Sequence, residues 1–155
     1  MSDMRTDQDQ QVLITRIFDA PRELVFQAWT DPDHVARWYG PDGFDTPRET
    51  VTIDLRVGGR YELGMVQKES GAVFPVRYEI IELDPPRLLV LKSEPMPEVG
   101  IHEPTVTRIE LHDHGDKTRM SLSDGPYTHS AHAEAGWHGA FAKLDGLLAR
   151  DGRPS

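Results

Sequence analysis

The hydrophobic pattern is most regular near the C-terminal end of the chain, in residues 128–150. Apolar side chains recur there every three or four residues, at Ala133, Trp137, Ala140, Phe141, Leu144, Leu147 and Leu148. This spacing predicts one long amphipathic helix, because it places these side chains on one face. Thr128 or Ser130 can cap its start, and Gly152 follows its end. Such a helix needs a broad apolar surface, and we expect the preceding residues to form it.

Three glycines, Gly136, Gly139 and Gly146, lie within this predicted helix. Each costs about 1 kcal/mol relative to alanine in a helix interior. Close packing of the helix against strands would explain them, and packing is the usual reason for a glycine in a helix. The alternative is that the missing side chains leave room for a ligand beside Trp137 and Phe141. Both explanations stay open.

The N-terminal part of the chain predicts one strand followed by two short helices. Apolar and polar residues alternate over residues 12–18, as in a strand. Pro21 suits the first position of a helix, whose buried stripe would be Leu24, Val25, Ala28 and Trp29. Asp31 can cap a second helix, which ends at residues 39–41. The expected buried positions of this second helix are Val35 and Trp38.

Between these helices and the C-terminal helix, apolar and polar residues alternate in a pattern typical of strands. The expected strands are residues 49–56, 61–65, 73–83, 88–92, 105–112 and 117–123. The expected connections are turns at 58–59, 70–71, 84–86 and 113–116, and a loop at 94–104. Glycine and proline mark most of these turns, because glycine accepts positive φ and proline cannot donate to a ladder. The prediction is an α+β fold in which an antiparallel sheet wraps one long helix.

The 155 residues are enough for a single domain, which we place at residues 12–150. Residues 1–11 are polar and are predicted to be a disordered tail, and residues 151–155 a short C-terminal tail. No apolar run is long enough for a membrane span, and the N-terminus has no signal-peptide core. The chain has no cysteine, which excludes disulfides, thiolate catalysis and cysteine-ligated metals. We expect a cytoplasmic protein.

The charge balance argues against polyanionic partners. There are 26 acidic and 17 basic residues, and the formal net charge is -9. Binding to phosphates needs clustered Lys and Arg, whereas here these residues are scattered among acids. Nucleic acid and an anionic membrane surface are therefore not expected as partners.

A set of mainly aromatic and sulfur-bearing residues is the candidate lining of an apolar cavity. Its members are Trp38, Tyr39, Tyr61, Leu63, Met65, Phe74, Tyr78, Met120, Trp137 and Phe141. Tyrosine hydroxyls would supply the few polar anchors that such sites use. The alternative is an ordinary filled core. The partner predicted from this set is a small apolar or aromatic molecule.

Ionisable residues give weaker candidates. Asp54 and Arg56 are two apart on one strand face and can orient a ligand or act as acid and base, although a pair on the outer surface is the commoner arrangement. The histidine pairs His112 and His114, and His129 and His132, do not supply the three or four converging ligands that zinc needs. We predict no metal and no other cofactor, and no catalytic residue is assigned.

Several motifs, in one order along the chain, resemble the activator of heat-shock-protein-90 ATPase homologue family. They are Phe18–Phe26 (FDAPRELVF), Ala28–Pro32 (AWTDP), Asp54–Tyr61 (DLRVGGRY), Glu82–Leu88 (ELDPPRL), Lys117–Met120 (KTRM) and Gly136-Trp137. The resemblance covers about Val12 to Leu148. It implies the helix-grip fold of the START-like (SRPBCC) superfamily, in which a seven-stranded antiparallel sheet curls around a long C-terminal helix and closes over a cavity.

For function, the resemblance implies three possibilities. Stand-alone members resemble small-molecule binders, which is the interpretation we favour, and Tyr78 narrows the pocket where relatives often have glycine. A second possibility is a co-chaperone-like regulator of a heat-shock-protein-90 ATPase in the stress response, although the chain shows no counterpart of the separate N-terminal domain of eukaryotic co-chaperones. The third is a cyclase- or dehydratase-like enzyme, which would need Asp54, Arg56 or His138 to face inward. A homodimer is left open.

Overall fold

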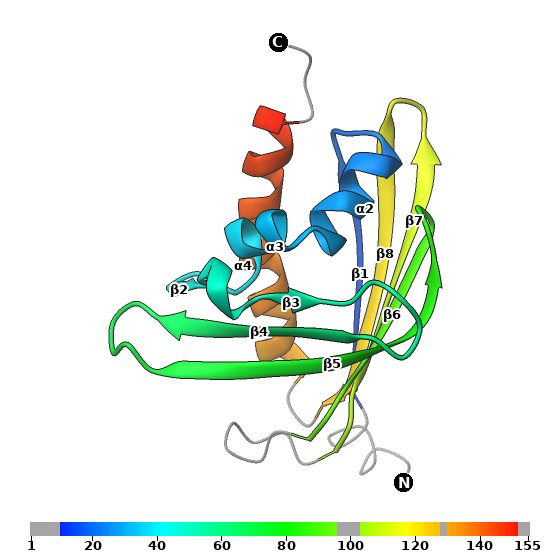
Figure 1. The fold of residues 1–155 in the computed structure, drawn as a ribbon. Coiled ribbons are helices and arrows are strands. Elements are labelled where there is room, and N and C mark those ends of the chain that lie inside the picture. The colour runs from blue at the N-terminus through cyan, green and yellow to red at the C-terminus, as the bar shows by residue number, and fades with distance from the viewer. Residues whose placement is uncertain (1–9, 96–102, 128–129, 152–155) are drawn as a thin grey trace, which may run out of the picture.

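The computed structural model describes residues 10–95, 103–127 and 130–151. Most of the predicted tails and of the predicted loop at 94–104 lie outside these ranges. Helix α4 (Ser130–Asp151) runs along the inner side of a curled sheet, and two short helices lie beside it (Figure 1). The two short helices are α2 (Arg22–Thr30) and α3 (Pro32–Trp38). The predicted long C-terminal helix is confirmed.

The sheet is antiparallel throughout, and seven of its strands follow one another in the order β1-β8-β7-β6-β5-β4-β2. In that order the strands are Gln10–Phe18, Lys117–Tyr127, Val106–His114, Leu88–Ser93, Val73–Asp84, Arg60–Gln67 and Phe44–Asp45. An eighth short strand, β3 (Thr52–Ile53), also pairs with β4. The predicted α+β helix-grip fold is therefore confirmed.

The core lies between α4, the two short helices and the inner face of the sheet. Trp29 is fully buried, and its ring lies 4.8 Å from that of Trp38 and 6.1 Å from that of Phe141, measured between centroids. Phe141 also meets Phe18 of β1 edge-to-face, with centroids 5.9 Å apart. Rings from three helices and one strand thus interlock, and this arrangement fixes the position of α4 against the sheet.

The two short helices are joined by specific polar contacts. The Asp31 side chain accepts a hydrogen bond of 2.9 Å from the Asp33 backbone N–H, which confirms the predicted cap of α3. The Trp38 indole N–H donates to the Ala28 carbonyl at 2.8 Å and ties α3 to α2. Pro21 occupies the N-cap of α2 and not its first helical position, one residue from the prediction.

The predicted strand at 49–56 is wrong. Residues Arg48–Thr50 form a 3-10 helix, and only the two residues of β3 pair with β4. The chain turns earlier than expected, because the Arg56 backbone N–H bonds to the Asp54 carbonyl at 2.8 Å. A Cβ at Gly59 would overlap the Asp54 carbonyl oxygen, so glycine there permits this wide turn. Strand β2 was not predicted.

Strands β7 and β8 are both longer than predicted. His114 pairs with Lys117, so the hairpin turn consists of Gly115 and Asp116 only. At its other end, β8 continues beyond the predicted limit of Ser123 to Tyr127. This extension adds Asp124 and Tyr127 to the strand.

Two of the three helix glycines, Gly136 and Gly139, face the loop that follows α3. A Cβ at Gly139 would lie 3.1 Å from the Asp42 backbone nitrogen, which is tighter than an ordinary contact. A Cβ at Gly136 would lie 3.7 Å from a Pro41 side-chain carbon. Close packing therefore explains Gly139, although the partner is a loop and not a strand as expected. Gly136 also borders the cavity described next.

Candidate functional site

A cavity of about 170 Å³ lies between the N-terminal half of α4 and the sheet, and it is partly open to solvent. Four parts of the chain line it: the loop after α3, strands β4 and β5, the end of β8, and α4. The lining residues are Tyr39, Gly40, Pro41, Met65, Val76, Tyr78, Asp124, Tyr127, Ala133, Gly136, Trp137 and Ala140. The described part of the wall is mostly apolar and aromatic, and it contains a single carboxylate.

That carboxylate, Asp124, is held at the inner side of β8. Met120 and Leu122 precede it at alternate positions and are buried, so the strand period places Asp124 on the same inward face. Its side chain accepts three hydrogen bonds, and the residue is 1% exposed. The Thr107 hydroxyl donates to Oδ1 at 2.8 Å, while the Tyr127 hydroxyl and the Trp137 indole N–H donate to Oδ2 at 2.7 and 2.8 Å.

The surroundings of Asp124 disfavour its charge. Burial raises the pKa of the Asp124 carboxyl above its usual value, and the three hydrogen bonds oppose this shift only in part. All three donors are neutral groups. None of the described residues that line the cavity is Lys, Arg or His, so the part of the chain described by the structure provides no counter-ion here.

Tyrosine hydroxyls form the rest of the polar surface. The hydroxyls of Tyr39 and Tyr78 lie 2.9 Å apart in a hydrogen bond. Burial is the largest cause that raises the pKa of Tyr39, Tyr78 and Tyr127 above the usual tyrosine value. These three residues are therefore neutral phenols at physiological pH, able both to donate and to accept hydrogen bonds.

Of the ten residues predicted to line a cavity, four lie in its wall, five lie in the packed core and one lies in neither place. Tyr39, Met65, Tyr78 and Trp137 lie in the cavity wall. Five others are buried in the packed core: Trp38, Tyr61, Leu63, Met120 and Phe141. Phe74 is half-buried, and its ring lies 5.7 Å from that of Phe44.

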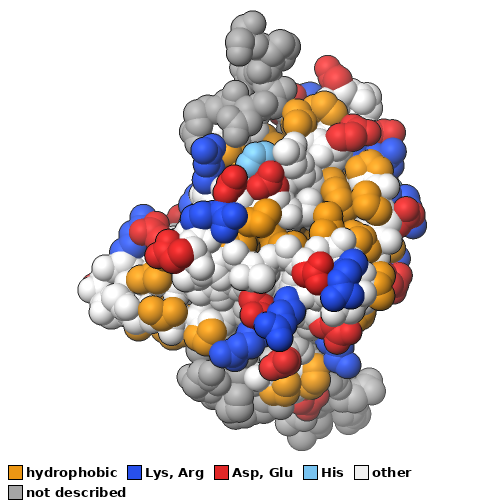
Figure 2. Space-filling model, in the orientation of Figure 1, with side chains coloured by type: hydrophobic (Ala, Val, Ile, Leu, Met, Phe, Trp, Pro, Cys, Tyr) orange, Lys and Arg blue, Asp and Glu red, His pale blue; other side chains and the backbone are white. Residues whose placement is uncertain are grey.

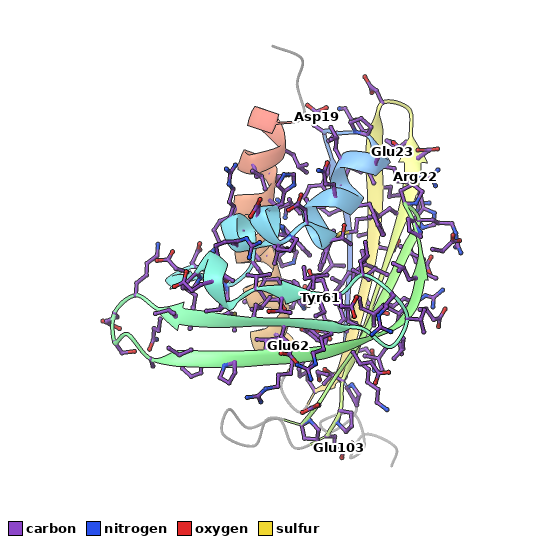
Figure 3. The ribbon with its side chains drawn as sticks, in the orientation of Figure 1. Asp19, Arg22, Glu23, Tyr61, Glu62 and Glu103 are labelled. Carbon is purple, nitrogen blue, oxygen red and sulfur yellow. The ribbon has the colours of Figure 1, made fainter. Side chains whose placement is uncertain are left out.

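Tyr61 illustrates the core group. It points to the inner side of β4, while the next residue, Glu62, projects to the other side (Figure 3). The Tyr61 hydroxyl donates to the Trp29 carbonyl, so its polar end is already satisfied within the core. Tyr61 is fully buried and is not part of the cavity wall.

The ionisable candidates lie at the surface. Arg56 donates to Asp54 at 2.7 Å, and both side chains are largely exposed. His138 lies 3.5 Å from Glu134 on the solvent side of α4. In the described part of the chain, no group of three or more His, Asp or Glu side chains gathers to hold a metal ion. His129 and the His132 side chain lie outside the described residues.

Charges on the surface are mixed. Figure 2 shows basic and acidic side chains interspersed on the face that carries β4 and β5, without a broad patch of one sign. Among the described residues, none of the helices has the length and apolar character needed to cross a membrane.

The antiparallel sheet curled around a C-terminal helix, with a pocket between them, defines a helix-grip protein of the START-like type. Residues 19–149 match the family of Activator of Hsp90 ATPase homolog 1-like proteins, and the chain belongs to this family. The resemblance found in the sequence is thereby confirmed. No curated protein matches the chain.

Solved structures with the same fold come from several bacteria. Protein CV1439 from Chromobacterium violaceum is 23% identical, with a TM-score of 0.81, and the match covers 89% of this chain and 96% of that one. Protein NE0264 from Nitrosomonas europaea is 22% identical, with a TM-score of 0.77 and coverage of 91% and 95%. An AHSA1-like protein from Aeromonas hydrophila is 23% identical, with a TM-score of 0.76 and coverage of 92% and 94%. These similarities establish the fold.

Proposed function

We propose that this protein binds a small lipophilic or aromatic molecule in the cavity between α4 and the sheet. The observation that supports the proposal is the cavity itself, whose wall includes the rings of Tyr39, Tyr78 and Trp137. Concave, mostly apolar pockets with a few polar groups are the usual form of small-molecule sites.

The size of the cavity limits the ligand. Pockets for drug-sized ligands usually measure about 300–1,000 Å³, whereas this one measures about 170 Å³. An engineered apolar cavity of about 150 Å³ in another protein binds benzene. The ligand expected here is therefore one ring with a small substituent, or a longer molecule that extends through the opening.

Benzyl alcohol is a suitable neutral probe, and the indole N–H signals of the three tryptophans report where it binds. Only Trp137 lines the cavity, while Trp29 and Trp38 lie in the core. We expect benzyl alcohol to shift the Trp137 signal in a saturable way in ¹H–¹⁵N NMR spectra. A titration in which no tryptophan signal responds would contradict the proposal.

A matched pair of variants on α4 locates the binding. Ala133 lines the cavity, whereas Ala135 is exposed on the same helix. Ala133→Trp should fill the cavity and abolish the response, while Ala135→Trp should leave it unchanged. Equal responses in the two variants would place benzyl alcohol elsewhere.

Family membership favours a second candidate, a co-chaperone-like role on an Hsp90 ATPase. The measurement is the ATP turnover of purified Hsp90 with and without the full chain. Unchanged turnover, together with no co-migration of the two proteins, would remove this candidate.

A further inference from the structure

We propose that the cavity selects a cationic ligand, a protonated amine next to an aromatic ring, with Asp124 as its counter-ion. This inference rests on the proposed function and names the class of ligand. The Asp124 carboxyl is 1% exposed and is bonded to three neutral donors, and no described side chain of the cavity wall is basic. A buried charge is costly unless it is paired, and a cationic ligand would supply the missing partner.

The carboxylate has acceptor capacity left for a ligand. Its two oxygens provide about four acceptor positions. Thr107 uses one on Oδ1, and Tyr127 and Trp137 use two on Oδ2. The described residues therefore leave one position on Oδ1 unused, and Asp124 is part of the cavity wall. Bonds between an ammonium group and a carboxylate are about twice as strong as neutral ones.

The rings around Asp124 also favour a cation. Tyr39 and Trp137 both lie in the cavity wall with Asp124. The faces of tyrosine and tryptophan rings attract ammonium groups, and the attraction is stronger where water is excluded. Tyr78 and Tyr127 complete the aromatic part of the wall.

No other described group in the cavity opposes a positive charge. Among the described residues, the titratable groups that face Asp124 are Tyr39 from the loop after α3, Tyr78 from β5 and Tyr127 from β8. All three have raised pKa values and are neutral at physiological pH. The net charge of the whole chain, -9, favours the approach of cations and disfavours anions.

Three probes of similar size test the inference on the full chain: benzylamine, which is protonated at neutral pH, neutral benzyl alcohol and anionic benzoate. We expect benzylamine to bind roughly tenfold tighter than benzyl alcohol or more, because a charge-assisted bond replaces a neutral one. Benzoate should not bind. The readout is the Trp137 indole signal, whose N–H donates to Asp124.

Asp124→Asn removes the charge while keeping the shape. The Asn carbonyl oxygen can accept from Tyr127 and Trp137, and its amide can donate to the Thr107 hydroxyl. The variant should bind benzyl alcohol as the wild type does and lose the preference for benzylamine. Asp116→Asn, in the exposed β7–β8 turn, is the matched control and should keep the preference.

A second measurement serves if Asp124→Asn does not fold. In the wild type, protonation of Asp124 removes its charge, so the preference for benzylamine should fall as the pH drops through the pKa of this carboxyl. A preference that persists below that pH, or in the folded Asp124→Asn variant, would overturn the inference.

Equal binding of benzylamine and benzyl alcohol would also overturn the inference, although the proposed function would then stand. If none of the probes binds the wild type, the proposed function fails as well.

Discussion

The two halves of α4 carry the same amphipathic pattern and yet meet the sheet in different ways. In the C-terminal half, Phe141, Leu144 and Leu147 are at most 2% exposed and fill the space between helix and sheet. In the N-terminal half, Ala133 and Gly136 occupy the inner side and border the cavity. Periodicity places a side chain on a face, and side-chain size then decides whether that face is filled.

The polar groups follow the same division. In the core half, two buried donors bond to backbone acceptors: Trp38 donates to the Ala28 carbonyl, and Tyr61 to the Trp29 carbonyl. The buried Trp29 indole N–H has no hydrogen-bond partner among the described residues. In the cavity half, donors converge instead on the Asp124 carboxylate. The cavity half is thus distinguished from the core half by a buried acidic side chain on which its donors converge.

The largest expected effect is on stability, and it tests whether the core half is packed more tightly than the cavity half. Phe141→Ala should lower the free energy of unfolding by about 3–5 kcal/mol, because it removes a fully buried ring that contacts four other rings. Met65 is half-buried in the cavity wall, and Met65→Ala should lower the free energy of unfolding by only about 1–2 kcal/mol. Urea unfolding followed by circular dichroism measures both. Equal losses would mean that the two halves do not differ in packing.

The second prediction concerns the hydrogen bonds around Asp124. Thr107→Val keeps the size of a residue that is fully buried but removes its hydrogen bond to Asp124. We expect Thr107→Val to lower the free energy of unfolding by about 1–3 kcal/mol, because this is the usual cost of removing a hydrogen-bond partner from a buried polar group. The control is Thr15→Val on the outer face of β1, which should change the free energy of unfolding by less than about 0.5 kcal/mol. If the two variants unfold alike in urea, the Asp124 network does not stabilise the fold.

Much of the fold was predictable, because long runs of alternating or helical spacing specify elements and their buried faces. The short elements were not. The sequence around Asp54 alternates like a strand, but the wide turn that Gly59 permits ends the pairing after two residues. Such a turn depends on a backbone contact that periodicity does not encode.

The cavity was predictable only in part. Tyr39, Tyr78 and Trp137 were among the expected lining residues, whereas Asp124 and Tyr127 were missed. The sequence Asp124-Gly125-Pro126 is typical of turns, so the predicted strand stopped before it. The available signal was alternation: Asp124 continues the inward series of Met120 and Leu122. A single carboxylate in such a series indicates a buried polar site.

The third prediction concerns the pH dependence of stability. The folded state raises the pKa of Asp124, so it holds this proton more tightly than the unfolded chain does. The stability that protonated Asp124 contributes is fully present below the pKa of this group in the unfolded chain, about 3.9. It is lost as the pH rises through the pKa of Asp124 in the folded state. The free energy of unfolding of the wild type should therefore fall relative to that of Asp124→Asn across this interval.

Urea unfolding at a series of pH values, with the exposed Asp116→Asn as control, provides the measurement. Asp116→Asn changes an exposed carboxyl in the β7–β8 turn and so controls for the same substitution away from the cavity. A constant difference between wild type and Asp124→Asn would show that burial does not disfavour the Asp124 charge. The cavity would then need no cationic ligand to balance it.

The smallest effect is expected at the surface pair of Asp54 and Arg56. Both side chains are largely exposed, at 49% and 67%, and such pairs contribute roughly 0–1 kcal/mol. Arg56→Ala should change the free energy of unfolding by less than about 0.5 kcal/mol and leave the benzylamine response of Trp137 intact. A double-mutant cycle with Asp54→Ala measures the coupling. A large coupling energy, or a lost response, would connect this pair to the cavity and end the division of the molecule into a functional interior and a solvated exterior.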